Sequence, residues 1–262
     1  MGTVLEAVET VRGHDRTSTD LAAEAARRAL RGASAELLVN ASVYRDGSVM
    51  EPANATFVQR SINGRGRMLS FDVANGACGV LNAVQIVHGF IETGAVRRGL
   101  VVTADVDPTP GVSQGFAYDT VGGAVTLVPG GPGEGFEAFW QWTYPEHAAL
   151  HHSTIEWTGT HHAVRLREDP ALHAHAMACI GDASDRIFSQ TGLRHDDVDL
   201  VVTSPTDTGA EGPVHTAGVV MALDRVAAAV ADGARRVLVL VSGSGITVTA
   251  ASYVAPGLAG GR

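Results

Sequence analysis

The sequence contains no lysine, only two cysteines and few aromatic residues. Its 19 basic residues are therefore all arginine, and the 28 acidic residues give a net charge of −9. The arginines form no basic stripe, so composition and charge argue against a nucleic-acid partner. Cys78 and Cys179 are too few for a disulfide framework and lack the spacing of metal ligands.

Long apolar runs are also missing. No stretch of about 18 apolar residues could cross a bilayer, and the opening MGTVLEAVETVRGHDR lacks the basic start and apolar core of a secretory signal. We therefore expect a cytoplasmic protein with no membrane partner. The 262 residues suffice to bury a large core, either as one compact unit or as two closely packed halves.

One structural theme occurs twice along the chain. An alanine-rich segment, Ser18–Leu30, predicts a helix capped by Ser18 or Thr19 and leads into a predicted strand over 36–43. In the second half, a predicted helix over 180–190 leads into a predicted strand over 199–205. A duplication of this kind indicates two similar halves.

Each half continues in the same way. A glycine-rich entry opens a second helix, which ends at glycine and feeds a β-branched strand behind an arginine pair, RRGLVVTADV from Arg97 and RRVLVLVSGSG from Arg235. Further strands close the halves at 122–129 and 246–256. We expect a layered α/β architecture of one compact unit, divided into halves at 1–133 and 134–262.

The stretch 136–169 is the least regular part of the sequence, and we expect it to form the crossover between the halves and a surface loop region. It concentrates aromatic residues, namely Trp140, Trp142, Tyr144 and Trp157. Those side chains could either cover a pocket or contact a partner.

Three segments resemble one known family. The run LSFDVANGACGVLNAVQIVHGFIETGAVRRGLVVTADV resembles the nucleophile segment of ketosynthase III and related thiolase-fold synthases. The helix STDLAAEAARRAL and the turn in LVLVSGSGITVTAASY are similar to that family's first helix and final glycine-rich strand turn. The resemblance implies the thiolase fold, with two pseudo-symmetric βαβ-type halves in a layered α-β-α-β-α sandwich.

The resemblance also implies that three catalytic positions are vacated. The family's nucleophilic cysteine, which a helix N-terminus activates, falls on Ala77. The histidine and asparagine that activate the extender thioester and stabilise the enolate oxygen fall on Ser204 and Pro213. Neither alanine nor proline offers a reactive side chain, and proline has no backbone N–H.

Nearby residues offer alternatives. Cys78 directly follows the vacant position and would be either a displaced nucleophile or a buried small apolar residue. His215 would be either a substitute base or a structural hydrogen-bond donor. His147 and His151 share a face if they lie on a helix, with His152, His161, His162, His173 and His175 nearby, but no zincin motif accompanies them. We expect neither a metal nor a cofactor.

Two functions follow as hypotheses. In the first, the chain is a non-catalytic pseudoenzyme similar to the small subunit of the alkylquinolone-forming synthase pair, shortened relative to the family. It pairs with an active ketosynthase III-like subunit, as a heterodimer or heterotetramer, in polyketide, fatty-acid-like or quinolone-like biosynthesis, with acyl carrier protein or acyl-CoA as possible ligands. In the second, it is an acyltransferase that uses Cys78 or His215 on such a thioester.

Overall fold

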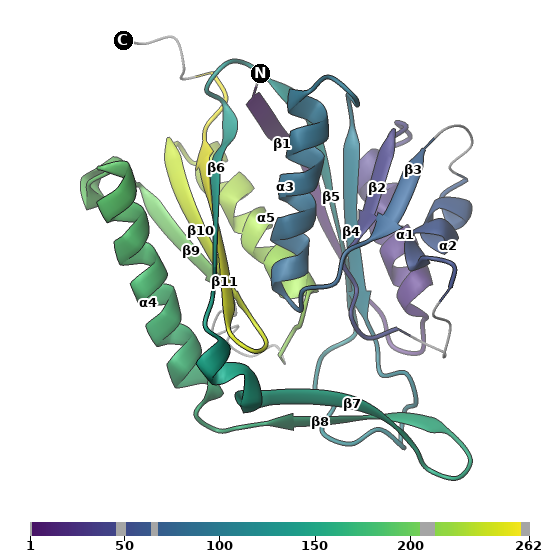
Figure 1. The fold of residues 1–262 in the computed structure, drawn as a ribbon. Helices are drawn as coiled ribbons and strands as arrows, with labels where there is room; N and C mark the ends of the chain where they lie inside the picture. The colour runs from purple at the N-terminus through teal and green to yellow at the C-terminus, as the bar shows by residue number, and fades with distance from the viewer. Residues whose placement is uncertain (1, 46–50, 64–67, 205–212, 258–262) are drawn as a thin grey trace.

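The computed structural model describes residues 2–45, 51–63, 68–204 and 213–257. A nine-stranded sheet runs through the molecule in the order β3-β2-β4-β5-β1-β6-β11-β10-β9, and β7 and β8 form a separate hairpin (Figure 1). The strands are β1 (Gly2–Arg12), β2 (Leu37–Asn40), β3 (Leu69–Asp72), β4 (Gly99–Asp105), β5 (Val121–Gly130), β6 (Gly135–Thr143), β7 (His151–Trp157), β8 (His162–Glu168), β9 (Leu200–Ser204), β10 (Arg236–Gly243) and β11 (Thr247–Val254).

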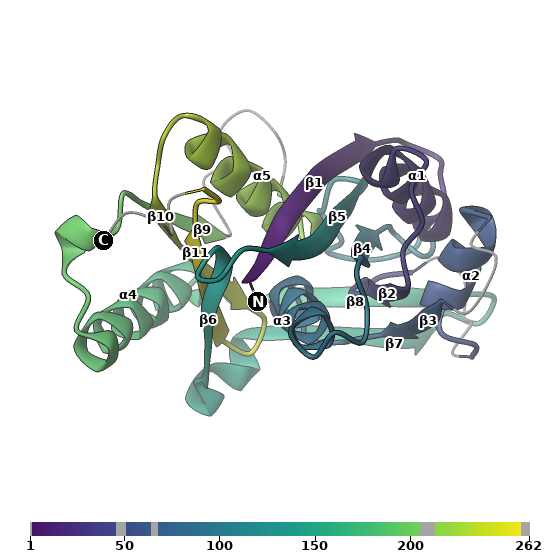
Figure 2. The ribbon, with the colours of Figure 1, turned by 90° about the horizontal axis from the view of Figure 1, so that it is seen from above.

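The helices form three layers around this sheet. Viewed from above, α3 and α5 lie in the middle, α1 and α2 lie on one outer side, and α4 lies on the other (Figure 2). Three buried apolar clusters fill the spaces between these layers. The helices are α1 (Ser18–Leu30), α2 (Asn54–Ser61), α3 (Cys78–Glu92), α4 (Leu172–Thr191) and α5 (Ala217–Ala231), with short 3-10 turns η1 (Pro145–Leu150) and η2 (His195–Asp197).

The two halves of the sheet repeat one pairing scheme. In the first half β2 is parallel to β4, β4 is antiparallel to β5, and β5 is antiparallel to β1. In the second half β9, β10, β11 and β6 repeat those relations. The halves meet where β1 and β6 pair at Thr3 and Gly135. This confirms the predicted fold with its internal duplication, while the division at 133/134 stays a prediction.

The second half is shorter than the first by one unit. In the first half α2 and β3 stand between β2 and α3, and β3 pairs with the outer edge of β2. In the second half β9 ends at Ser204 and α5 begins at Ala217. Among the described residues no strand pairs with the outer edge of β9, which therefore ends the sheet.

Two local predictions were wrong. Helix α1 is capped by Thr17, whose hydroxyl accepts a hydrogen bond from Asp20 N at 3.0 Å. Ser18 and Thr19 are instead the first helical residues. The stretch 136–169 is not a loop region, because β6, η1, β7 and β8 occupy most of it. Its aromatic residues alternate with polar ones along β6, and that alternation is the signal of a strand.

The aromatic residues of 136–169 lie in two different environments. Trp140, Trp142 and Tyr144 are partly buried against the apolar cluster beneath α4. Trp157, near the tip of the hairpin, is 62% exposed. Among the described residues, no helix has the length and apolar character needed to cross a membrane.

Candidate functional site

The first part of the candidate site is the start of α3. Ala77 precedes the first helical residue and is partly buried, and its methyl group offers no hydrogen-bonding or nucleophilic atom. The adjacent Gly76 has a φ of 51°, a left-handed conformation that glycine adopts easily. The turn thus presents a small apolar side chain at the positive end of the helix dipole.

Cys78 faces the protein interior at the same turn. Its residue is fully buried, and its Sγ donates to Thr247 O at 3.2 Å and lies 3.5 Å from Val241 O. Burial raises the pKa of this thiol to about 11, so it is neutral at physiological pH. A Cβ on Gly243 would lie only 3.1 Å from Sγ, because β10 passes directly over the thiol. These contacts favour the interpretation of Cys78 as a buried small residue, while its displaced-nucleophile role stays a prediction.

The second part of the site surrounds the start of α5. Ser204 is buried at the end of β9, with its Oγ 3.6 Å from the place where a Cβ on Gly218 would stand. Pro213 is exposed, and its carbonyl accepts a hydrogen bond from Asp119 N at 2.8 Å. The structure therefore places Ser204 and Pro213, the two second-half positions that the resemblance implies are vacated, near the same end of α5.

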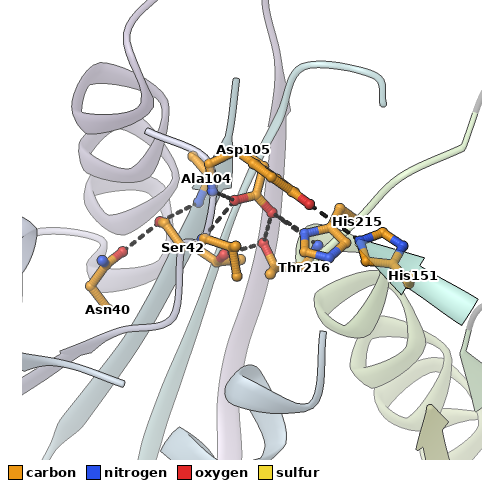
Figure 3. A network of polar contacts seen from close by, with 10 residues as sticks. Asn40, Ser42, Ala104, Asp105, His151, His215 and Thr216 are labelled. Carbon is orange, nitrogen blue, oxygen red and sulfur yellow. Dashed lines mark hydrogen bonds and ion pairs between the residues drawn. The ribbon is translucent and has the colours of Figure 1, made fainter. Parts of the chain in front are cut away.

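His215 is held by a buried carboxylate. Its Nδ1 lies 2.7 Å from Asp105 Oδ2, and the side chains of both residues are less than a tenth exposed. Because the carboxylate accepts the Nδ1 proton, Nε2 is the ring nitrogen left for a further partner. Figure 3 shows this contact, in which Asp105 comes from the end of β4 and His215 from just before α5.

Asp105 accepts a dense set of hydrogen bonds. Oδ1 accepts from the backbone amides of Val43 and Tyr44, each at 2.8 Å. Oδ2 also accepts from the Thr216 hydroxyl at 2.5 Å and from its amide at 3.2 Å. Burial opposes the charge of this carboxylate, but the charge and hydrogen bond of His215 and these donors hold the pKa of Asp105 below its usual value. An ionised, fully bonded carboxylate therefore joins the two halves.

Aromatic rings close around His215. The rings of Tyr44 and Tyr118 have centroids 5.2 and 4.8 Å from the imidazole, and Phe116 packs edge-on against both tyrosines. Beyond them His151, from the base of the hairpin, places Nε2 3.5 Å from the Tyr44 hydroxyl. These contacts fit both roles predicted for His215. They suit a structural hydrogen-bond donor, and they also hold the imidazole in the orientation of a general base.

The histidines predicted to share a helical face lie on different elements. His147 lies in η1 and His151 begins β7, so the expected shared helical face was wrong. His147 instead packs against His175 of α4, with ring centroids 4.4 Å apart. Within the described ranges no group of three or more His, Cys, Asp or Glu side chains could hold a metal ion.

Asp105 and Tyr44 were missed by the sequence analysis. The sequence does contain a signal for Asp105. This acidic residue ends the apolar strand GLVVTAD, and a carboxylate that is buried there needs hydrogen-bond or charge partners. No comparable signal marks Tyr44, which reaches His151 and His215 only through tertiary packing.

Known proteins share part of this sequence. The β-ketoacyl-[acyl-carrier-protein] synthase III of Alkalilimnicola ehrlichii is 37% identical over 95 residues, which are 35% of this chain and 29% of that protein. The mycobacterial β-ketoacyl-[acyl-carrier-protein] synthase III of Mycobacterium tuberculosis is 29% identical over 201 residues, or 72% of this chain and 59% of that protein. The chain thus spans less than two thirds of these relatives. No protein-family profile matches it.

Solved structures share the fold over almost the whole chain. FabH, the 3-oxoacyl-(acyl carrier protein) synthase III of Pseudomonas aeruginosa, superposes with a TM-score of 0.79 at 18% identity, covering 98% of this chain and 99% of that one. OleA of Xanthomonas campestris, solved with lauric acid and lauroyl-CoA, gives a TM-score of 0.79 at 16% identity, covering 97% and 99%. The chain therefore has the thiolase fold of these ketosynthase structures.

In this thiolase fold the start of α3 is the place that the resemblance assigns to the nucleophile. Ala77 occupies it, and Cys78 lies one residue further along the helix, about 100° around its axis. The assignments of Ala77, Ser204 and Pro213 to vacated roles stay predictions. Within the described residues, the Asp105–His215 contact is the acid–base pair of this site.

Proposed function

We propose that the chain is a non-catalytic thiolase-fold subunit that pairs with an active ketosynthase III-like subunit. The observation that carries this proposal is the start of α3, where Ala77 has no nucleophile and the Cys78 thiol is buried beneath Gly243. Without a thiolate the chain cannot form the acyl-enzyme intermediate on which covalent acyl transfer depends.

An exposed sheet edge supports the pairing. Leu69 begins the edge strand β3 and is 49% exposed, although its neighbour β2 is fully buried. An apolar residue on an unpaired strand edge is a liability that a partner removes. The pairing proposed here continues the sheet of one subunit into that of the other along β3.

The proposed pathway context comes from the relatives. Ketosynthase III and OleA relatives carry names that refer to acyl carrier protein and acyl-CoA. We assign this subunit to acyl condensation in a specialised polyketide, fatty-acid-like or quinolone-like pathway in the cytoplasm. Its role there is to stabilise the active subunit and to shape its acyl site, without a metal or cofactor of its own.

A second candidate function is favoured by one observation. The 2.7 Å contact between His215 Nδ1 and Asp105 orients the imidazole as a general base. With such a base the chain would be an acyltransferase on an acyl-CoA or acyl-carrier-protein thioester. A His215→Gln variant that abolished a measurable acyl-transfer activity of the purified chain would favour this candidate.

The pairing is tested by co-expression. The chain is produced together with each ketosynthase III homologue of its own genome, and complexes are analysed by size-exclusion chromatography with light scattering and by native mass spectrometry. We expect one homologue to form a stoichiometric complex, and we expect Leu69→Lys to weaken it while Ile155→Lys on the hairpin does not. If every homologue elutes separately from the wild-type chain, the proposed function is wrong.

A further inference from the structure

The opposite end of the sheet carries a second exposed edge. β9 is the last strand, and its first two residues, Leu200 and Val201, are 39% and 44% exposed. β9 contains no charged residue, proline or bulge that would protect such an edge. Within the described residues, no strand pairs with the outer backbone groups of β9, which lie beside these apolar side chains.

The internal duplication shows what covers an edge of this kind. Glu36, just before β2, donates its amide to Arg98 O at 3.0 Å, and its carboxylate accepts from the amides of Arg97 and Arg98. Asp199, just before β9, donates its amide to Arg236 O at 2.9 Å, and its carboxylate accepts from the amides of Arg235 and Arg236. Residue for residue, β9 is the counterpart of β2.

The two counterparts differ only in what lies outside them. Leu37 and Leu38 of β2 are 0% exposed, because β3 pairs with the outer edge of β2 in parallel and α2 packs against both strands. Leu200 and Val201 occupy the equivalent places in β9 and have no such cover within the described residues. The fold thus contains its own example of the missing neighbour, which is a parallel strand of apolar character.

The charge beside β9 adds a second requirement. Exposed Asp196 lies just before the strand, and the carboxylate of Asp199 is bound to backbone amides and not to a cation. In the first half, the sequence before β3 is basic, GRGR at 64–67, where it precedes the strand that neighbours Glu36. A segment that replaces β3 beside β9 should likewise begin with a basic residue.

We infer that the outer edge of β9 is a docking site for an extended segment of the partner ketosynthase subunit. The segment runs parallel to β9, begins with a basic residue near Asp196, and supplies the apolar cover that β3 gives to β2. Its end lies beside Ser204 at the start of α5. This inference rests on the proposed function, since it names a second surface and the kind of segment by which the partner binds.

The first experiment compares the hydrogen–deuterium exchange of residues 200–204 in the free chain and in the co-expressed complex. The second measures the affinity of the Val201→Lys variant for the partner subunit. In the complex we expect these amides to exchange at least about tenfold more slowly, because new strand pairing protects them. We expect Val201→Lys to weaken binding by about tenfold, corresponding to the loss of one interface anchor. Ile155→Lys, another lysine at an exposed apolar site, is the matched control.

The outcomes are distinguishable. A complex in which residues 200–204 exchange as fast as in the free chain, and which tolerates Val201→Lys, overturns this inference and leaves the pairing role standing. Protection of the same residues in the free chain at high concentration, with dimers seen by light scattering, also overturns it, because a second copy then covers the edge. The absence of any complex refutes the proposed function itself. The melting temperatures of Val201→Lys and the wild type are also measured, and equal values show that the variant is folded when its affinity is compared.

Discussion

At the scale of single residues, the close approach of β10 to α3 explains why position 243 is glycine. A Cβ there would lie 3.1 Å from Cys78 Sγ and 3.3 Å from Cys78 N, and the backbone amide cannot move aside without disturbing the start of the helix. The burial of the Cys78 thiol therefore depends on the absence of a side chain at residue 243.

We therefore expect Gly243→Ala to lower the free energy of unfolding by about 1–3 kcal/mol, the usual effect of overpacking a core. Gly89→Ala is the matched control, because a Cβ at Gly89 meets no atom within 4 Å and the residue lies on exposed helix. There we expect a gain of up to about 1 kcal/mol from helix propensity. Urea titrations of both variants test this, and equal stabilities would show that Cys78 is not packed as described.

The buried carboxylate of Asp105 supports a larger prediction. Asp105→Asn removes the charge that the His215 and Thr216 donors surround, and breaking a buried pair of this type costs about 3–5 kcal/mol. Asp119→Asn alters an exposed ion pair with Arg12 and should cost no more than about 1 kcal/mol. Urea-induced unfolding measures both, and a small effect at position 105 would mean that the network does not hold the halves together.

His151 makes stability depend on pH. Burial lowers the pKa of this histidine below its ordinary value of 6.5, and the Glu168 carboxylate, 3.6 Å from Nδ1, offsets only part of the effect. The unfolded chain then binds more protons near neutral pH, so the free energy of unfolding falls as the pH falls through 6.5 toward the lower folded pKa. Tyr44, Glu168, His152 and His215 are the titratable neighbours of this group.

We expect His151→Gln to flatten this pH dependence between neutral and mildly acidic conditions. His173→Gln, at an exposed helical position, should leave it unchanged. Melting temperatures recorded across that pH range test the assignment. A wild-type slope that persists in His151→Gln would assign the effect to another group.

At the scale of elements, the sequence predicts best where apolar periodicity is strong. The bounds of α1 agree with the prediction although its cap does not, and the predicted β-branched strands behind the arginine pairs are β4 and β10. The strand β1 and the strands of 136–169 were not predicted. β1 and β6 mix apolar, polar and glycine residues, and their pairing depends on partners far along the chain, namely β5 and β11.

The candidate site was only partly predictable, because some of its contacts also join residues far apart in the chain. Ala77 and Cys78 are local to one helix start, so their places follow from sequence spacing. The Asp105–His215 contact joins residues 110 positions apart, and no local pattern encodes it. The burial of Cys78 also depends on Gly243, which lies in the other half.

At the scale of the whole molecule, the two halves of the sheet share one pairing scheme but differ in length among the described residues. The second half retains the four strands that continue the sheet, while the counterparts of α2 and β3 are missing among the described residues. The shared core around α3 and α5 remains filled from both sides. This arrangement supports the proposed role as a ketosynthase-like subunit without a nucleophile at the start of α3.

We therefore expect that this chain does not itself carry an acyl group. Intact-protein mass spectrometry of the purified chain and of Cys78→Ala, after incubation with a panel of acyl-CoA thioesters, tests it most directly. We predict no covalent adduct on either protein, because Ala77 has no nucleophile and the pKa of the buried Cys78 thiol is raised to about 11. A stoichiometric adduct on the wild type that disappears in Cys78→Ala would contradict the account and make Cys78 the nucleophile.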